Sequence, residues 1–259
     1  MPLAHGAQPW SFDSQGPDAH IGVLMIHGFT GSPASMTPWG KSLSTYGWSI
    51  RVPRLPGHGS RWQDMNLTTW EDWYAEVERN LRELQATCDQ VFICGLSMGG
   101  SLALRLAQQH GEEISGLVLV NPAVHSERPE RHLLPIISKM IKAFPGISND
   151  IAKPGQDEVG YTKIPLRAAH SLAQLWKNIK ADIAEVTQPV LLFRSLADHV
   201  VEASNAQWIL DHVSSTDKEE VLLENSFHVA TLDYDAEIIE TISADFIKGR
   251  ITVKPDLTS

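Results

Sequence analysis

One stretch near the middle of the chain constrains its fold more than any other. Residues 91–103 pass from an apolar run into Gly-Leu-Ser-Met-Gly and then into a small-residue helical pattern. This order predicts a strand, a tight turn and a helix, with Ser97 exposed at the apex of the turn. A Cβ atom at Gly95 or Gly99 would strike the neighbouring strand or helix, so the spacing has a steric cause. A Ser-Gly turn that merely joins two buried elements does not explain these offsets.

The helix that begins after Ser97 would point its free N–H groups and positive dipole end towards the serine. Negative charge develops at such a point during acyl transfer, so the stretch is suited to a nucleophilic serine. A hydroxyl is a poor nucleophile at neutral pH and needs a base within hydrogen-bond reach, which in turn needs an orienting acid.

Apolar and β-branched runs, alternating with helical patterns, predict an α/β fold with a mainly parallel sheet that helices cover on both faces. Along the helix predicted over 235–248, we expect Ile238, Ile239, Ile242 and Phe246 to face inward. Residues 124–186 break the alternation, which predicts one domain over 1–259 with an inserted lid. The predicted strands are 10–12, 21–27, 48–52, 91–94, 116–120, 190–194 and 219–223; the predicted helices are 35–46, one from 69, one after 97, 203–212 and 235–248.

Active sites in such sheets gather outside the carboxyl ends of the strands, and turns of this kind carry their partners in the order serine, acid, histidine. Asp198 follows the strand at 190–194, and His228 follows the last strand. We therefore expect Asp198 as the orienting acid and His228 as the base. Glu224 and Asp233 are the rival acids.

The donors that would stabilise an oxyanion are backbone N–H groups rather than side chains. We expect them at Met98, directly after the serine, and at Phe29, in the loop after the first core strand. His27 either supports this loop through a side-chain hydrogen bond or is a buried histidine that the backbone satisfies. His58 is expected to fix its own loop, and His199 to be a solvated loop residue.

Composition narrows the partners. The formal net charge of -10 argues against nucleic acid or anionic membranes as general partners. No apolar run approaches the length of a membrane span, and the first residues lack the pattern of a signal peptide. With Cys88 and Cys94 interpreted as reduced packing residues, this favours a cytoplasmic location. We expect no metal and no cofactor, because no zinc-ligand spacing or phosphate-binding glycine loop occurs.

Several segments together resemble the bacterial monoacylglycerol lipases and related small carboxylesterases of the α/β-hydrolase superfamily. The resemblance covers nearly the whole chain. It implies a triad of Ser97, Asp198 and His228, a small lid, and action on monoacylglycerols and short- to medium-chain acyl esters. The segments are His27-Gly28-Phe29-Thr30-Gly31, Arg54-Leu55-Pro56-Gly57-His58-Gly59, Thr68-Thr69-Trp70-Glu71-Asp72-Trp73, Gly95-Leu96-Ser97-Met98-Gly99-Gly100 and the run from Asn225 to Asp233.

The resemblance is weakest in the lid, over about 124–186. Within it, the resemblance implies that Glu158 contacts the glycerol headgroup and that Ile147 lines the pocket. An apolar helical face is also predicted there, which either packs on the body of the protein or forms a wall of the acyl tunnel and touches lipid interfaces. The residues of this face are Leu133, Ile136, Ile137, Met140, Ile141 and Phe144.

Other functions stay open at this level, because a fold does not settle the reaction. One is a thioesterase or another acyl hydrolase on the same fold, and another is a non-catalytic ligand receptor on a hydrolase scaffold. The sequence leaves open whether the chain is a monomer or a homo-oligomer.

Overall fold

The structure is a computed structural model that describes residues 3–129 and 133–252. The strands are β1 (Trp10–Phe12), β2 (Ile21–Ile26), β3 (Ser49–Val52), β4 (Gln90–Leu96), β5 (Gly116–Val120), β6 (Ala143–Pro145), β7 (Lys163–Pro165), β8 (Val190–Ser195) and β9 (Lys218–Leu223). The α-helices are α1 (Thr37–Ser44), α2 (Trp62–Met65), α3 (Trp70–Gln85), α4 (Met98–His110), α5 (Leu134–Met140), α6 (Leu166–Ala181), α7 (Ser204–His212) and α8 (Ala236–Lys248).

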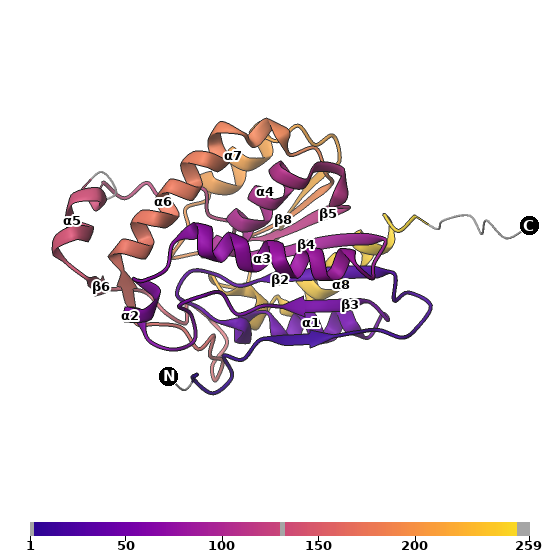
Figure 1. Ribbon diagram of the computed structural model, residues 1–259, viewed down its shortest axis with the longest axis horizontal. Helices are drawn as coiled ribbons and strands as arrows, with labels where there is room; N and C mark the ends of the chain where they lie inside the picture. The colour runs from indigo at the N-terminus through magenta and orange to yellow at the C-terminus, as the bar shows by residue number, and fades with distance from the viewer. Residues whose placement is uncertain (1–2, 130–132, 253–259) are drawn as a thin grey trace, which may run out of the picture.

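A seven-stranded sheet in the order β1-β3-β2-β4-β5-β8-β9 forms the centre of the molecule (Figure 1). Its first pair, β1 and β3, is antiparallel, and every other neighbouring pair is parallel. The mainly parallel α/β-hydrolase sheet predicted from the sequence is therefore confirmed. The carboxyl ends of β4, β8 and β9 meet at one edge of this sheet.

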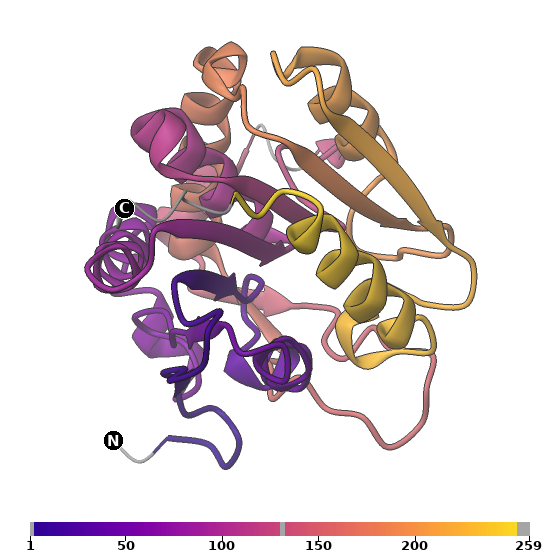
Figure 2. The same ribbon diagram turned by 90° about the vertical axis from the view of Figure 1, so that its right-hand side faces the viewer.

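Alternating side chains of the sheet build two apolar cores, as expected for strands buried on both faces. In β2, Leu24 and Ile26 belong to the core that includes side chains of α3, α4, α6 and α7, whereas Val23 and Met25 belong to the core that includes those of α1 and α8. Figure 2 shows α8, in yellow, and α1 on the same side of the sheet. The two layers of helices fix the strands and so fix the edge at which the loops converge.

Most predicted elements occur within a few residues of their expected positions. The start of α3 has a capping box, in which the Thr69 backbone N–H donates to Asp72 Oδ2 at 2.8 Å. One expectation for α8 is wrong: Ile238 is 44 % exposed, while Ile239 and Phe246 are buried. Ile238 precedes Ile239 by one residue, and adjacent helical positions point about 100° apart, so only one of the two can face the core.

Residues 124–186 fold differently from the expectation. The apolar pattern does not form one helical face, because α5 ends at Met140 and Phe144 lies in the short strand β6, which pairs with β7. Nor does the pattern pack on the body, since Ile136 is 63 % exposed and Met140 is 82 % exposed. Figure 1 shows α5 and β6 at one end of the molecule, beyond the sheet.

Across the described ranges, none of the helices combines the length and the apolar character that a membrane crossing requires.

Candidate active site

The turn between β4 and α4 holds Ser97 in a strained backbone conformation. Its φ is 57° and its ψ is −116°, a region that residues other than glycine rarely adopt. The Ser97 N–H donates to Val120 O at 2.9 Å, which anchors the turn to β5. A Cβ at Gly95 would overlap Gly99 O in α4, and a Cβ at Gly99 would overlap Ile26 O at the end of β2. The steric reason given for the motif is therefore confirmed.

Asp198 and His228 lie on the loops after β8 and β9, which are neighbouring strands. His228 Nδ1 lies 2.7 Å from Asp198 Oδ2, and both side chains are buried. The other carboxylate oxygen of Asp198 accepts the backbone N–H groups of Val200 and Val201, each at 2.8 Å. Both oxygens are thus committed, and the carboxylate has a fixed orientation towards the imidazole.

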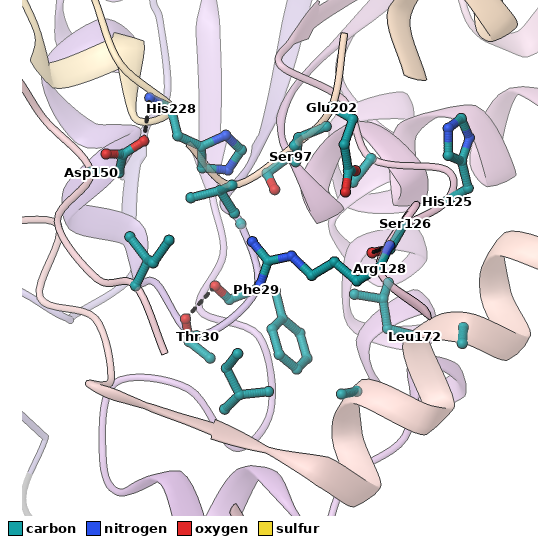
Figure 3. A pocket seen from close by; sticks show the side chains of 18 of the residues that line it. Phe29, Thr30, Ser97, His125, Ser126, Arg128, Asp150, Leu172, Glu202 and His228 are labelled. Carbon is teal, nitrogen blue, oxygen red and sulfur yellow. Dashed lines mark hydrogen bonds between the residues drawn. The ribbon is translucent and has the colours of Figure 1, made fainter. Parts of the chain in front are cut away.

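Ser97 and His228 line the same cavity of about 440 Å³. Figure 3 shows the side chains of Ser97 and His228 near each other at its edge. The walls are mostly apolar, with Leu134, Ile137 and Phe144 contributed by the 124–186 segment. The structure thus brings together all three side chains that the sequence analysis selected for nucleophile, acid and base.

The charges around His228 favour its protonated form. Burial alone would lower the pKa of the imidazole, but the hydrogen bond and charge of Asp198 outweigh that effect, with smaller contributions from Glu158 and Asp150, so the pKa is raised. Burial would raise the pKa of Asp198, yet the contacts with His228 and two backbone N–H groups hold it below the ordinary value. Asp198 therefore stays ionised beside a basic imidazole.

Neither rival acid contacts His228. Glu224 is exposed. Asp233 is buried, but its carboxylate accepts the backbone N–H groups of Ala152, Lys153 and Phe227 at 2.7–2.9 Å. Asp233 thus ties residues 152–153 to the loop after β9, and no hydrogen bond joins it to the imidazole within the described ranges.

The backbone N–H groups of Phe29 and Met98 lie beside Ser97. Met98 is the first residue of α4, where an N–H has no partner within the helix. Within 3–129 and 133–252, neither N–H donates a hydrogen bond. Gly28 allows the Phe29 loop to approach, since a Cβ there would lie 3.3 Å from Ser97 Cβ. Two backbone donors are thus available next to the serine hydroxyl.

His27 is fully buried and bonds to the loop that carries Phe29. Its Nε2 accepts the Leu55 N–H at 3.2 Å, so Nδ1 carries the proton and donates to Gly28 O at 2.9 Å. Burial lowers the pKa of His27 to about 4. His58 packs edge-on against His27, and its Nδ1 contacts Pro56 O at 3.0 Å within its own loop. Both histidines are therefore neutral parts of the scaffold.

Glu158 and Ile147 both line the cavity. The Glu158 side chain is buried, and its Oε1 accepts the Asn149 N–H at 3.0 Å. Its Oε2 faces Gly31, where a Cβ would come within 2.9 Å, and accepts no hydrogen bond from the part of the chain that the structure describes. Burial raises the pKa of this carboxyl. Ile147 is half-exposed at the rim.

Sequence reasoning missed two polar residues that hold the site together. Asn121, at the end of β5, donates through Nδ2 to His228 O at 2.8 Å and has a φ of 44°. Asp150, in the 124–186 segment, accepts the backbone N–H of His228 at 3.1 Å. For Asn121, its place at the carboxyl end of a core strand was an available signal, whereas no local pattern distinguished Asp150.

Comparison with known proteins gives consistent relatives. The chain is 39 % identical to a thermostable monoacylglycerol lipase of Bacillus sp. (strain H-257), over 95 % of this chain and 96 % of that protein. It is 26 % identical to a carboxylesterase of Bacillus subtilis (strain 168), over 93 % of this chain and 96 % of the relative. Among solved structures, one chain described under the two metagenome-derived lipolytic enzymes LipS and LipT matches with a TM-score of 0.91 and 36 % identity, covering 96 % of this chain and 100 % of the other.

A family model described as serine aminopeptidase, S33, matches residues 17–235, which include the serine turn, both loops that carry Asp198 and His228, and the 124–186 segment. From this match and the relatives above, the chain belongs to the serine aminopeptidase S33 family of α/β hydrolases.

Proposed function

We propose that the protein hydrolyses carboxylic esters through an acyl-enzyme intermediate, with Ser97 as nucleophile, His228 as base and Asp198 as orienting acid. The observation that carries the proposal is the 2.7 Å contact between His228 and Asp198 at the edge of the cavity that Ser97 also lines. The relatives, a monoacylglycerol lipase, a carboxylesterase and lipolytic enzymes, support the same class of reaction.

In the first half-reaction, His228 Nε2 takes the Ser97 proton as Oγ attacks the ester carbonyl carbon. Asp198 stabilises the resulting imidazolium, which then protonates the leaving alcohol as the C–O bond breaks. In the second half-reaction, His228 takes a proton from water, the hydroxide attacks the acyl-enzyme, and the proton returns to Ser97 with release of the acid. This chemistry needs only the chain's own groups and water.

The negative oxygen of each tetrahedral intermediate needs donors that are in place before it forms. We assign this role to the backbone N–H groups of Phe29 and Met98. The assignment is supported by their position beside Ser97 and by the absence of competing acceptors among the described residues. The strained φ of Ser97 and the glycine at position 28 allow the hydroxyl and both donors to converge.

Monoacylglycerols are the substrates that the cavity suits best. An apolar volume of about 440 Å³ accommodates an acyl chain, while a diacylglycerol would have to place a second chain in the same space. The free Oε2 of Glu158 offers an acceptor for a glycerol hydroxyl, and Ile147 closes the rim beside it. Residues 124–186 act in this proposal as the lid of a single domain over 1–259.

The outer surface of the lid provides a contact for lipid interfaces. Leu133, Ile136 and Met140 are largely exposed, and Lys139 lies between them. An amphipathic surface of this kind partitions into the boundary between headgroups and acyl chains. The lid would thereby approach a dispersed substrate before the acyl chain enters the cavity.

Ser97→Ala tests the mechanism. We expect hydrolysis of p-nitrophenyl butyrate to fall to the background rate while the far-ultraviolet circular dichroism spectrum is unchanged. Wild-type turnover by this variant would refute the proposal. A series of monoacylglycerols of increasing chain length, compared with a diacylglycerol and an acyl-CoA, tests the substrate class. We expect a maximum at medium chains, with lower rates for the diacylglycerol and the thioester.

A further inference from the structure

Asp150 occupies an unusual position between the lid and the two loops after β8 and β9. Its side chain is only 10 % exposed and lines the cavity. Oδ1 lies 2.8 Å from His199 Nδ1, and Oδ2 accepts the backbone N–H of His199 at 3.2 Å and that of His228 at 3.1 Å. Figure 3 shows the bond from His228 to Asp150. One carboxylate therefore contacts both loops at once.

The backbone of Asp150 adds a further bond, because its carbonyl accepts the Val229 N–H at 3.0 Å. Asp150 contacts the base, His228, and the residue after it, Val229. It also contacts His199, the residue after the acid Asp198. Asp198 is otherwise oriented by backbone N–H groups of its own loop. Besides the 2.7 Å contact itself and the edge-on packing of His199 on Phe227, Asp150 thus ties the acid's loop to the base's loop through three hydrogen bonds of its carboxylate.

We infer that Asp150 is a positioning residue for ester hydrolysis, whose carboxylate fixes His228 relative to Ser97 and couples that geometry to the lid. The inference rests on the proposed function of Ser97, Asp198 and His228. In the proposed reaction Asp150 touches no reacting atom, and it acts only through His228 and His199.

A carboxylate in this place also changes the electrostatic environment of the base. It contributes, after Asp198 and Glu158, to raising the pKa of His228 against the effect of burial. Replacing it with a neutral side chain lowers the pKa of His228, and the acidic limb of kcat/KM against pH, which reports the free enzyme's base, moves to lower pH. The charged or titratable side chains around the imidazole are Asp150, Glu158, Asp198 and His199, and the cavity is also lined by His125, Arg128 and Glu202.

This shift separates the inference from a purely structural role. If Asp150 only attached the lid to the rest of the protein, its substitution would change thermal stability. The pH profile of the folded fraction would then stay the same. A residue that positions and polarises His228 alters kcat and the pH profile together, while KM for a small soluble ester changes little.

The experiment compares Asp150→Asn and Asp150→Glu in the full-length protein, with p-nitrophenyl butyrate as substrate across pH 5–9. Asp150→Asn is isosteric but uncharged, and we expect kcat to fall about tenfold and the acidic limb to move about half a pH unit lower. Asp150→Glu keeps the charge but moves the oxygens by one methylene. We expect kcat to fall while the acidic limb stays at the wild-type pH.

Asp211→Asn is the matched control, because it removes an exposed carboxylate on α7 that contacts Gln207 rather than the site. We expect its pH profile and kcat to equal those of the wild type. Wild-type kcat and an unshifted acidic limb in folded Asp150→Asn would overturn the inference, whatever happens to its melting temperature.

His199→Ala keeps the inference testable if Asp150→Asn does not fold. The His199 side chain is 54 % exposed, so its removal spares the core while it deletes one of the groups bound to Asp150. We expect kcat to fall about threefold, as for the loss of one of several positioning contacts, and an unchanged kcat would contradict the inference. Ser97→Ala measured alongside separates the two proposals: its activity tests the triad, and only the Asp150 and His199 variants test the coupling.

Discussion

The serine turn and the lid are built in contrasting ways, although both form the same cavity. The turn is made of consecutive residues that are buried, with Gly95 and Gly99 at positions where a Cβ would overlap backbone atoms. The outer part of the lid consists of the short elements α5, β6 and β7, and Ile136 and Met140 project from it into solvent. The functional contacts proposed for the lid come from single side chains such as Glu158 and Asp150. The position of Ser97 is therefore determined by residues next to it in the sequence. The position of the substrate depends on side chains that lie far apart in the chain.

The most direct test of this contrast is to replace one glycine with alanine in each region. Gly99→Ala places a Cβ against Ile26 O, and we expect loss of activity and of several kcal/mol of stability, because backbone on both sides resists movement. Gly155→Ala, in the lid, meets no atom within 4 Å and carries only the strain of a φ of 79°, a cost of about 1 kcal/mol. Urea unfolding and esterase activity check both. Equal losses in the two variants would contradict the contrast.

Substitution of Asp198 tests whether the serine turn supports activity without the side chains contributed by distant loops. In Asp198→Asn, the side chain can still accept the N–H groups of Val200 and Val201, but it no longer stabilises the imidazolium. We expect kcat for p-nitrophenyl butyrate to fall about 10³–10⁴-fold with little change in melting temperature. A loss of activity that merely follows unfolding would argue that Asp198 is structural.

The buried His27, which bonds to the loop that carries Phe29, makes the stability of the fold sensitive to acid. Burial lowers the pKa of His27 to about 4, so the unfolded chain binds the proton more readily than the folded protein does. Stability is therefore complete above about pH 6.5 and falls as the pH drops towards 4, by at most about 1.4 kcal/mol per pH unit for this histidine. Urea unfolding of wild type, His27→Asn and the exposed-site control His5→Asn measures the effect. We expect a shallower acid slope in His27→Asn alone, and equal slopes would show that His27 is not responsible.

A smaller effect is expected from the glycerol contact that we propose for Glu158. Glu158→Gln keeps the acceptor for the Asn149 N–H but weakens the second oxygen as a partner for a glycerol hydroxyl. We expect kcat/KM for a monoacylglycerol to fall about tenfold, as for the loss of one hydrogen bond to a charged group. Because p-nitrophenyl butyrate has no glycerol, its kcat/KM should fall less. An equal fall for both esters would place the effect at the catalytic base instead.

The smallest effect tests the outer surface of the lid. Ile136→Ser removes exposed apolar area without touching the cavity wall. We expect hydrolysis of monoacylglycerol micelles, and sedimentation with phosphatidylcholine vesicles, to fall about threefold, which corresponds to partial burial of one side chain. Hydrolysis of soluble p-nitrophenyl butyrate serves as the control. Unchanged values for micelles and vesicles would remove this surface from the proposal.

The sequence predicted the sheet and the loops at its carboxyl edge on which Ser97, Asp198 and His228 lie. Ser97 and Asp198 follow the apolar strands β4 and β8, whereas β9 begins with three charged residues and is apolar only at its end. The sequence was insufficient for the lid, where the apolar pattern continues past the end of α5 into β6 and no single periodicity describes it. It also misassigned Ile238, since an apolar residue at a helix surface resembles one at the core.

Asp150 was missed for a different reason. It bonds to His228, 78 positions away in the chain, and nothing in the residues around it shows that contact. Asn121 likewise lies 107 positions from the carbonyl that it holds. Local patterns predict elements, but a partner at this separation becomes visible only when the strands are placed beside one another.

The order of the strands also sets when such a protein can begin to turn over its substrate. β9 is the edge strand of the sheet, and it delivers His228 only after it has docked on β8. A nascent chain whose serine turn has already left the ribosome still lacks His228. A refolding intermediate in which β9 has not docked lacks it too. Recovery of esterase activity after dilution from denaturant therefore requires β9 to have docked on β8, whereas the gain of helical circular dichroism does not.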